Sequence, residues 1–444
     1  MVSAVHSEEE LPREEFVEPE KLLELAKQSG AEAAEVLKSQ SRSRPVFFEA
    51  NRLKELQSAE SEGTALRVWR NGRPGIAVAY GAAAPQALVE RALALSELNE
   101  PETIELAGAS RTSYPDVGEA VGVEQLVLWG KEAIASIRDR YPELLCAVEL
   151  DCETETTRLV NSQGLDCSYQ DTTLSFYISA EWVRSDDFLM VSDGQMQRGY
   201  LEPQIVAKQI LQRLDWAKEN IEPPTGRVPI LFTAKAADML WGTLQAALNG
   251  KRVLEGASPW SDRSGQKVTS SAITISQQPH IGPFSCPFDD EGTPTQEIVF
   301  IQDGVLQQFY SSRATARSLG TPPTGNGFRP SLGSYPAPGL YNWLIQPGSR
   351  SLLELIASLE NGIVVDQMLG GGAGISGDFS INLDLAYRVL DGEIVGRVKD
   401  TMVAGNAYSA LKQLVELGGD AEWNGSCYSP SLIVEGLSVT GKEQ

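Results

Sequence analysis

Apolar side chains recur at helical spacing in several stretches of the chain. In residues 19–29, Leu22, Leu25 and Ala26 fall on one face of a helix, and Gly30 follows as a stop signal. The same spacing predicts further helices, and each of them has an apolar face to bury. Their ranges are 85–98, 123–140, 203–216, 234–248 and 352–359.

Between these stretches, runs of β-branched and aromatic residues predict strands. Asn71-Gly72 separates two such runs, and both residues can adopt the positive φ angles of a tight hairpin turn. Asp303-Gly304 and Asp391-Gly392 predict two more hairpins. The predicted strands are 45–49, 65–69, 75–80, 146–153, 158–160, 173–183, 228–232, 298–301, 306–310, 384–390 and 393–398.

The best boundary candidate is the segment Glu222-Pro223-Pro224-Thr225-Gly226, because Pro and Gly interrupt regular structure. It separates an N-terminal domain over residues 18–222 from a second domain over residues 223–444, which is rich in short strands and has few helices. The charged residues 1–17 are expected to form a flexible tail.

Charge and composition narrow the kinds of partner. The formal net charge is −23, so the chain would be repelled by DNA, RNA and anionic membranes. Residues 1–10 are polar and contain no signal-peptide core, and no apolar run approaches the ~20 residues that span a bilayer. We therefore expect a soluble, cytoplasmic protein with protein or peptide partners.

Side chains that commonly carry catalysis are scarce. The two histidines are His6, in the tail, and His280, in a predicted loop, and they lack the spacing of a zinc site. No G-x-S-x-G elbow is present, and Cys427 has no base near it in the sequence, so a nucleophilic role is the less favoured alternative. The cysteines show no C-x-x-C pair and are expected to be buried thiols. They are Cys146, Cys152, Cys167, Cys286 and Cys427.

Two segments have the composition of ligand-binding loops. Asp289, Asp290 and Glu291 could attract Ca²⁺ or Mg²⁺, but consecutive carboxylates do not converge on one ion, so a turn is favoured. The glycines of residues 370–374 lack the Lys-Ser/Thr of a phosphate loop, and backbone freedom explains them better. Asp378, which follows them, either caps a turn or helps to bind a peptide.

Several short motifs resemble, in identity and order, those of the TldD/PmbA family. The similarity extends over nearly everything from about residue 20 onward. The number of these motifs and their shared order, rather than any single motif, carry the resemblance. The motifs are Gly63 to Gly75, Leu159 to Leu165, Pro287 to Thr295, Gly304-Val305-Leu306, Thr324 to Gly327, Ile375 to Ser380, Asp391 to Val395, Ala404-Gly405-Asn406, Ser429 to Leu432 and Gly436 to Val439.

The resemblance implies an α+β fold, in which a domain of helices and antiparallel strands precedes a β-rich domain. TldD-type members are zinc metallopeptidases with an H-E-x-x-x-H helix and a later cysteine ligand, and PmbA-type (TldE) members lack these ligands. Aligned on Gly250, the histidine positions fall on Trp241 and Ala246 and the glutamate position on Gly242. The resemblance therefore implies a PmbA-type chain that holds no metal or cofactor of its own, with zinc in a TldD-type partner.

The family also implies a dimer that encloses a chamber, in which a heterodimer trims unfolded or leader peptides. Its names carry a link to microcin maturation and DNA gyrase. A non-catalytic subunit is the primary hypothesis. An independently active peptidase, a regulatory interaction protein and an inert homodimer remain alternatives. Candidate side chains for the peptide chamber are Asp289, Asp290, Glu291, Asn326, Asp378 and Phe379.

Overall fold

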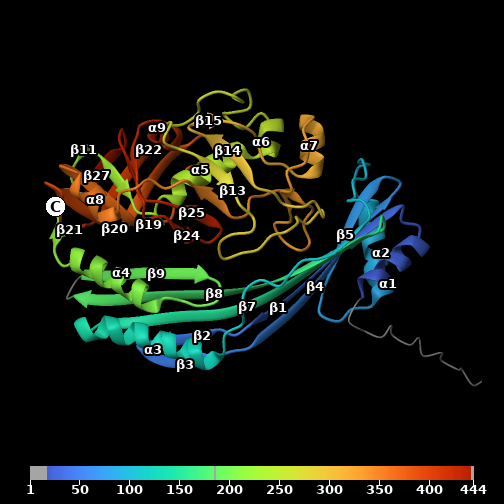
Figure 1. The fold of residues 1–444 in the computed structure, drawn as a ribbon, viewed down its shortest axis with the longest axis horizontal. Coiled ribbons are helices and arrows are strands. Elements are labelled where there is room, and N and C mark those ends of the chain that lie inside the picture. The colour runs from blue at the N-terminus through green and yellow to red at the C-terminus, as the bar shows by residue number, and fades with distance from the viewer. Residues whose placement is uncertain (1–17, 185–186, 442–444) are drawn as a thin grey trace, which may run out of the picture.

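The structure is a computed structural model that describes residues 18–184 and 187–441. Its described part consists of three larger sheets, a two-stranded ribbon and short to medium helices, so the α+β class is confirmed (Figure 1). His6 and the predicted flexible tail lie outside the described residues. Among the described helices, none combines the length and apolar character needed to cross a membrane.

The first sheet is a long, twisted, mostly antiparallel sheet that runs beneath the rest of the molecule in Figure 1. Its strands are β1 (Ala33–Ser43), β2 (Val46–Glu49), β3 (Arg52–Leu56), β4 (Ala59–Arg70), β5 (Arg73–Tyr80), β6 (Ser110–Ser113), β7 (Leu145–Asn161), β8 (Leu165–Arg184) and β9 (Asp187–Gln197). The longest strands, β7 and β8, pair along sixteen residue positions, from Leu145↔Glu181 to Val160↔Asp166, and form the backbone of the sheet.

Four helices cover one face of this sheet. They are α1 (Pro19–Gln28), α2 (Pro85–Ser96), α3 (Val123–Arg140) and α4 (Pro203–Trp216). Val36 of β1, Leu66 of β4 and Val160 of β7 pack with α1 and α2, and Leu150 of β7 and Phe176 of β8 pack with α3 and α4. These residues are even-numbered, and since side chains alternate along a strand, the odd-numbered residues of the same strands lie on the opposite face.

The second and third sheets form the C-terminal part of the molecule. The second contains β10 (Asn220–Ile221), β11 (Gly226–Arg227), β12 (Ile230–Phe232), β19 (Asn361–Leu369), β20 (Asp378–Leu390), β21 (Glu393–Val398), β22 (Thr401–Asn406), β23 (Leu414–Leu417), β26 (Leu432–Val434) and β27 (Ser438–Gly441). The third contains β13 (Ile275–Gln277), β14 (Ile298–Gln302), β15 (Val305–Leu306), β18 (Trp343–Ile345), β24 (Glu422–Asn424) and β25 (Cys427–Ser429). The ribbon is β16 (Gly327–Phe328) with β17 (Ala337–Pro338).

One hydrophobic core lies between these two sheets, and a second core joins the C-terminal part to the first sheet. The C-terminal helices are α5 (Asp238–Leu248), α6 (Gly250–Leu254), α7 (Arg313–Leu319), α8 (Leu352–Ala357) and α9 (Ala407–Lys412). In the joining core, Leu214 of α4 belongs to the same cluster as Leu231 of β12 and Tyr387 of β20. Helix α4 is therefore packed between the two parts.

The structure corrects several predicted elements. The strands predicted at 146–153 and 158–160 are one strand, β7, because β1 and β8 pair with the polar stretch between them. The helix predicted from residue 234 begins only at Asp238. Helices α7 and α9 were not predicted because each has fewer than two turns of apolar pattern, and both begin instead at a side-chain cap, from Ser312 and Asn406 respectively.

Candidate functional site

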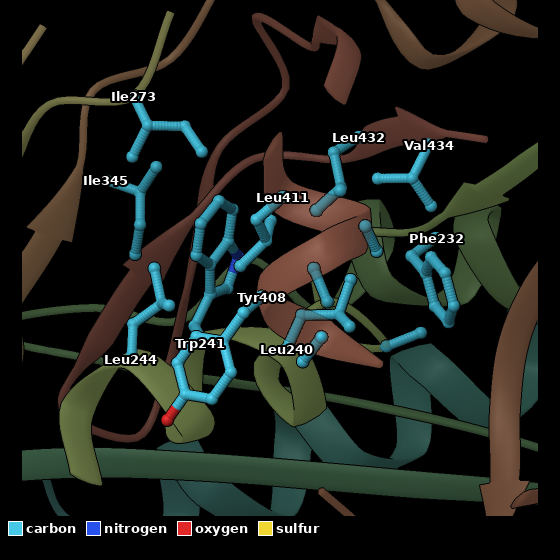
Figure 2. Packing of buried hydrophobic residues seen from close by; sticks show 14 of the residues in the cluster. Phe232, Leu240, Trp241, Leu244, Ile273, Ile345, Tyr408, Leu411, Leu432 and Val434 are labelled. Atoms are coloured by element: carbon cyan, nitrogen blue, oxygen red, sulfur yellow. The ribbon is translucent and has the colours of Figure 1, made fainter. Parts of the chain in front are cut away.

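Helix α5 contains Trp241, Gly242 and Ala246, the positions that the resemblance predicted to correspond to the zinc ligands and glutamate of TldD-type chains. Trp241 is 0% exposed and packs in the buried cluster that also contains Leu244, Ile345 and Leu411, as Figure 2 shows. The apolar stripe formed by Leu240, Leu244 and Leu248 is equally buried, which is why the helix docks with this face inward. The indole at position 241 thus occupies core volume.

The other two positions lie on a different side of α5. Gly242 and Ala246 are half-buried, and no atom lies within 4 Å of a Cβ placed on Gly242. An indole, a hydrogen and a methyl group offer no zinc ligand. These residues therefore do not fit a zinc ion.

A small polar cluster lies at the N-terminal end of α5. The carboxylate of Asp238 accepts a hydrogen bond from the Asn424 amide and contacts the Cys427 thiol. Burial raises the pKa of Asp238 to about 6, although both contacts oppose the shift. Burial, followed by the charge of Asp238, raises the pKa of the Cys427 thiol, so this cysteine is held protonated and is a poor nucleophile.

Next to this cluster, a cavity of about 410 Å³ opens between β9 of the first sheet and the C-terminal part. Four charged residues meet at its wall. Arg213 of α4 pairs with Asp193 and, through Nε, with Asp366 Oδ2 at 2.7 Å, and Lys235 pairs with Asp193. Burial opposes ionisation of Asp193, but Arg213 and Lys235 lower its pKa. Tyr177 and Trp423 supply aromatic lining.

The acidic turn predicted from the sequence is a buried structural turn. Asp289 Oδ1 accepts the backbone N–H groups of Glu291 and Thr293, at 3.1 and 2.8 Å, and Oδ2 accepts that of Gly327 at 2.8 Å. Glu291 Oε2 accepts the N–H of Arg313 at 2.7 Å. Burial and the neighbouring charge of Glu291 raise the pKa of Asp289.

Asp290 differs from its neighbours because it lines a second cavity, of about 370 Å³. The cavity lies between the odd-numbered face of the first sheet and the segment that carries Arg329 and Tyr341. Asp290 Oδ2 accepts the backbone N–H of Arg329 at 2.7 Å, and the guanidinium of Arg329 bonds Glu35 Oε1 at 2.9 Å. Arg67 Nη2 reaches the same Glu35 oxygen at 3.0 Å.

The remaining candidates are not gathered at this cavity. Asn326 is 0% exposed and donates to Gln277 Oε1 at 2.6 Å and to the Gly339 carbonyl at 2.8 Å, so its amide holds loops together. Asp378 is exposed and accepts from Asn406, while Phe379 is buried in the core. His280 is exposed in a turn. Within the part of the chain that the structure describes, no three His, Cys, Asp or Glu residues form a group that could hold a metal ion.

Sequence reasoning missed most of the residues that line the two cavities, among them Arg329, Tyr341, Arg213 and Lys235. They come from segments far apart in the chain, so no local motif indicates them. One local signal was available: Glu149 to Glu155 alternates acidic residues with others at the period of a strand.

Comparison with known proteins agrees with the fold and the motifs. Residues 225–441 match a family profile described as the PmbA/TldA metallopeptidase C-terminal domain, and residues 34–96 match the profile of PmbA/TldA metallopeptidase domain 1. The fold and these matches define a metallopeptidase-like protein. The chain belongs to the PmbA/TldD family.

Individual relatives extend this result. The chain is 27% identical over 418 residues to a metalloprotease from Methanothermobacter thermautotrophicus, covering 88% of each chain. It is 27% identical over 283 residues to the metalloprotease PmbA of Escherichia coli O157:H7, covering 61% of this chain and 60% of that protein. The crystal structure of TldE from Thermococcus kodakarensis has the same fold, with a TM-score of 0.88, 22% identity, and coverage of 95% of this chain and 99% of that chain.

Proposed function

We propose that this chain is a non-catalytic, PmbA/TldE-type subunit of a TldD-type metallopeptidase that processes unfolded or leader peptides. The observation that carries the proposal is the burial of Trp241 in the core, at the position that the resemblance matches to a zinc-binding histidine of TldD-type chains. A residue that packs in this way cannot be exchanged for a ligand without opening the core.

In this proposal, the partner supplies zinc, which polarises the peptide carbonyl and activates water. The present chain supplies walls and binding groups. The two cavities, of about 370 and 410 Å³, lie along one face of the first sheet and offer both charged and aromatic contacts to a peptide. An extended peptide can also pair with the edge of a sheet, which binds the backbone without regard to its sequence.

The experiment compares the purified chain, a TldD-type subunit from the same genome and the two co-expressed. We expect a stable complex, stoichiometric zinc only when the TldD-type subunit is present, and EDTA-sensitive cleavage of an unfolded peptide by the complex. A complex whose TldD-type subunit carries Gln in place of the H-E-x-x-x-H glutamate is the matched control and is expected to be inactive.

Three outcomes would overturn the proposal in different ways. Stoichiometric zinc with EDTA-sensitive cleavage by the isolated chain would make it an independently active peptidase. A stable complex in which this chain leaves cleavage unchanged or suppresses it would make the chain a regulatory interaction protein. Failure to form any complex, with only homodimers in solution, would also contradict the proposal.

A further inference from the structure

A row of carboxylates crosses the open face of the first sheet. Glu149, Asp151, Glu153 and Glu155 are alternate residues of β7, so their side chains share the face opposite the helices. Successive members are about 7 Å apart along the strand, and the row is about 20 Å long. All but Asp151 are exposed.

Neutral hydroxyls, and not cations, accompany this row. From β1, the Ser39 hydroxyl donates to Glu155 at 3.3 Å and the Ser41 hydroxyl to Glu153 at 2.5 Å. Ser43 donates to Asp151 at 2.9 Å.

Within the described residues, none of the four carboxylates forms an ion pair, and no metal-binding group of three is present. Although Glu155 reaches solvent, the cavity walls around it desolvate its carboxylate, and this burial, followed by the charge of Glu153, raises the pKa of Glu155.

The row runs along three neighbouring cavities, which together are called the groove. The cavity beside Asp290 and a smaller one of about 80 Å³ share Glu155 as a wall. The smaller cavity in turn shares Ser175 and Met196 with the cavity beside Tyr177. The three cavities therefore adjoin along β7 and β8, and each of the four carboxylates lines at least one of them.

One end of the groove contains a buried donor that lacks partners. The side chain of Arg329 is 1% exposed and lines the first cavity. Its Nη2 bonds Glu35, but neither Nε nor Nη1 has a hydrogen-bond partner among the described residues. Buried N–H donors without partners are costly, so this end favours a ligand that brings a carbonyl or carboxylate oxygen. This preference for a ligand oxygen at Arg329 does not depend on the row of carboxylates.

We propose that this groove binds an extended peptide with lysine or arginine at alternate positions, with a peptide oxygen at Arg329. The inference rests on the proposed function, for which it names the substrate class. An extended peptide that lies over the open face, along β7, has the same two-residue period as the row. Its basic side chains can therefore reach successive carboxylates. A block of consecutive basic residues would direct half of its charges away from them.

The experiment measures the affinity of the isolated full chain for fluorescent eight-residue peptides by anisotropy. The probes are an alternating Lys-Ser peptide, the same residues arranged as a Lys block and a Ser block, and an alternating Gln-Ser peptide. The alternating Lys peptide is expected to bind roughly 10-fold more tightly than the block peptide, and its affinity is expected to fall as salt rises. Because no cleavage is measured, this result is separate from the test of the peptidase complex.

The test variant replaces the row with amides and keeps side-chain size. It carries Glu149→Gln, Asp151→Asn, Glu153→Gln and Glu155→Gln. The matched control removes four exposed carboxylates outside the groove, on β3, α2 and α3. It carries Glu55→Gln, Glu90→Gln, Glu124→Gln and Glu132→Gln. The test variant is expected to bind the alternating Lys peptide roughly 10- to 100-fold more weakly, and the control within about 3-fold of the wild type.

Thermal unfolding checks that the variants remain folded, so that their peptide affinities can be compared. Removal of uncompensated like charges should leave the midpoint of the test variant equal to or above that of the wild type. Equal binding of the Lys and Gln peptides, or equal losses in the test and control variants, would overturn the proposal. So would loss of peptide binding when the TldD-type subunit is added, because the groove would then be an interface between the subunits.

Discussion

Among single residues, Glu422 links the stability of the fold to pH. It lies at the start of β24, with Oε2 3.9 Å from Lys235 Nζ. Burial raises the pKa of Glu422 from 4.5 to about 7 even though Lys235 opposes the shift. The folded state therefore holds a proton that the unfolded chain releases between these two values. The contribution of protonated Glu422 to the free energy of unfolding is complete below about pH 4.5 and is lost as pH rises through 7.

We expect Glu422→Gln to remove this loss. At pH 8 the variant should gain about 1–2 kcal/mol in free energy of unfolding over the wild type, a value reduced from the full shift for partial exposure, and at pH 4 the gain should vanish. Urea unfolding between pH 4 and 8 measures the difference. Asp238, with its pKa near 6, still titrates in both proteins, so some pH dependence remains. Parallel curves for variant and wild type would contradict the assignment.

At the scale of the element, we expect substitutions at two adjacent positions of helix α5 to change the free energy of unfolding in opposite directions. Trp241→Ala removes a fully buried indole from the core and should lower the free energy of unfolding by about 3–5 kcal/mol. Gly242→Ala adds a methyl group where no atom lies within 4 Å and should raise it by about 0.5–1 kcal/mol through helix propensity. Denaturant unfolding of both variants checks the signs. If Gly242→Ala lowered the free energy of unfolding as much as Trp241→Ala, both sides of the helix would have to be tightly packed, which would contradict this prediction.

The hairpin between β4 and β5 offers a second test at this scale. A Cβ on Gly75 would lie 2.1 Å from the Ala92 carbonyl oxygen of α2, so Gly75→Ala should push the helix from the sheet at a cost of about 3 kcal/mol. Gly72→Ala would make only ordinary van der Waals contacts, with Pro101 at 3.6 Å and Glu102 at 3.7 Å, and should cost only about 1 kcal/mol, for its positive φ of 70°. Chemical denaturation of the two variants gives the comparison, and equal losses would mean that the turn, not the helix contact, limits stability.

The sequence predicted elements well where one local pattern decides the structure. Helices α3 and α4 have the predicted bounds, and Asn71-Gly72 forms the expected hairpin turn with φ angles of 54° and 70°. It failed where distant pairing decides. The polar residues of β7 show no apolar run, yet β1 and β8 hold them in one strand. Similarly, the wall around Arg329 depends on Glu35, which is 294 positions away in the chain.

At the scale of the whole molecule, the core that contains α4 bears on the predicted division at residue 222. Leu214 of α4 shares a buried cluster with Leu231 and Tyr387 of the second sheet, and Arg213 pairs there with Asp366. β10, at residues 220–221, already pairs with β21. A cut at 222 would therefore expose apolar surface in both pieces and separate the buried Asp366 from Arg213.

We accordingly expect the two parts to unfold together. Fluorescence and circular dichroism should report one coincident transition for the full chain, since a core shared by both parts couples their stabilities. Fragments 18–222 and 223–444, expressed separately, should bind a hydrophobic dye and lack cooperative unfolding, and mixing them should restore it in part. Two independently folded fragments, whose midpoints match two transitions of the full chain, would show instead that the shared core contributes little and that the boundary is a true domain border.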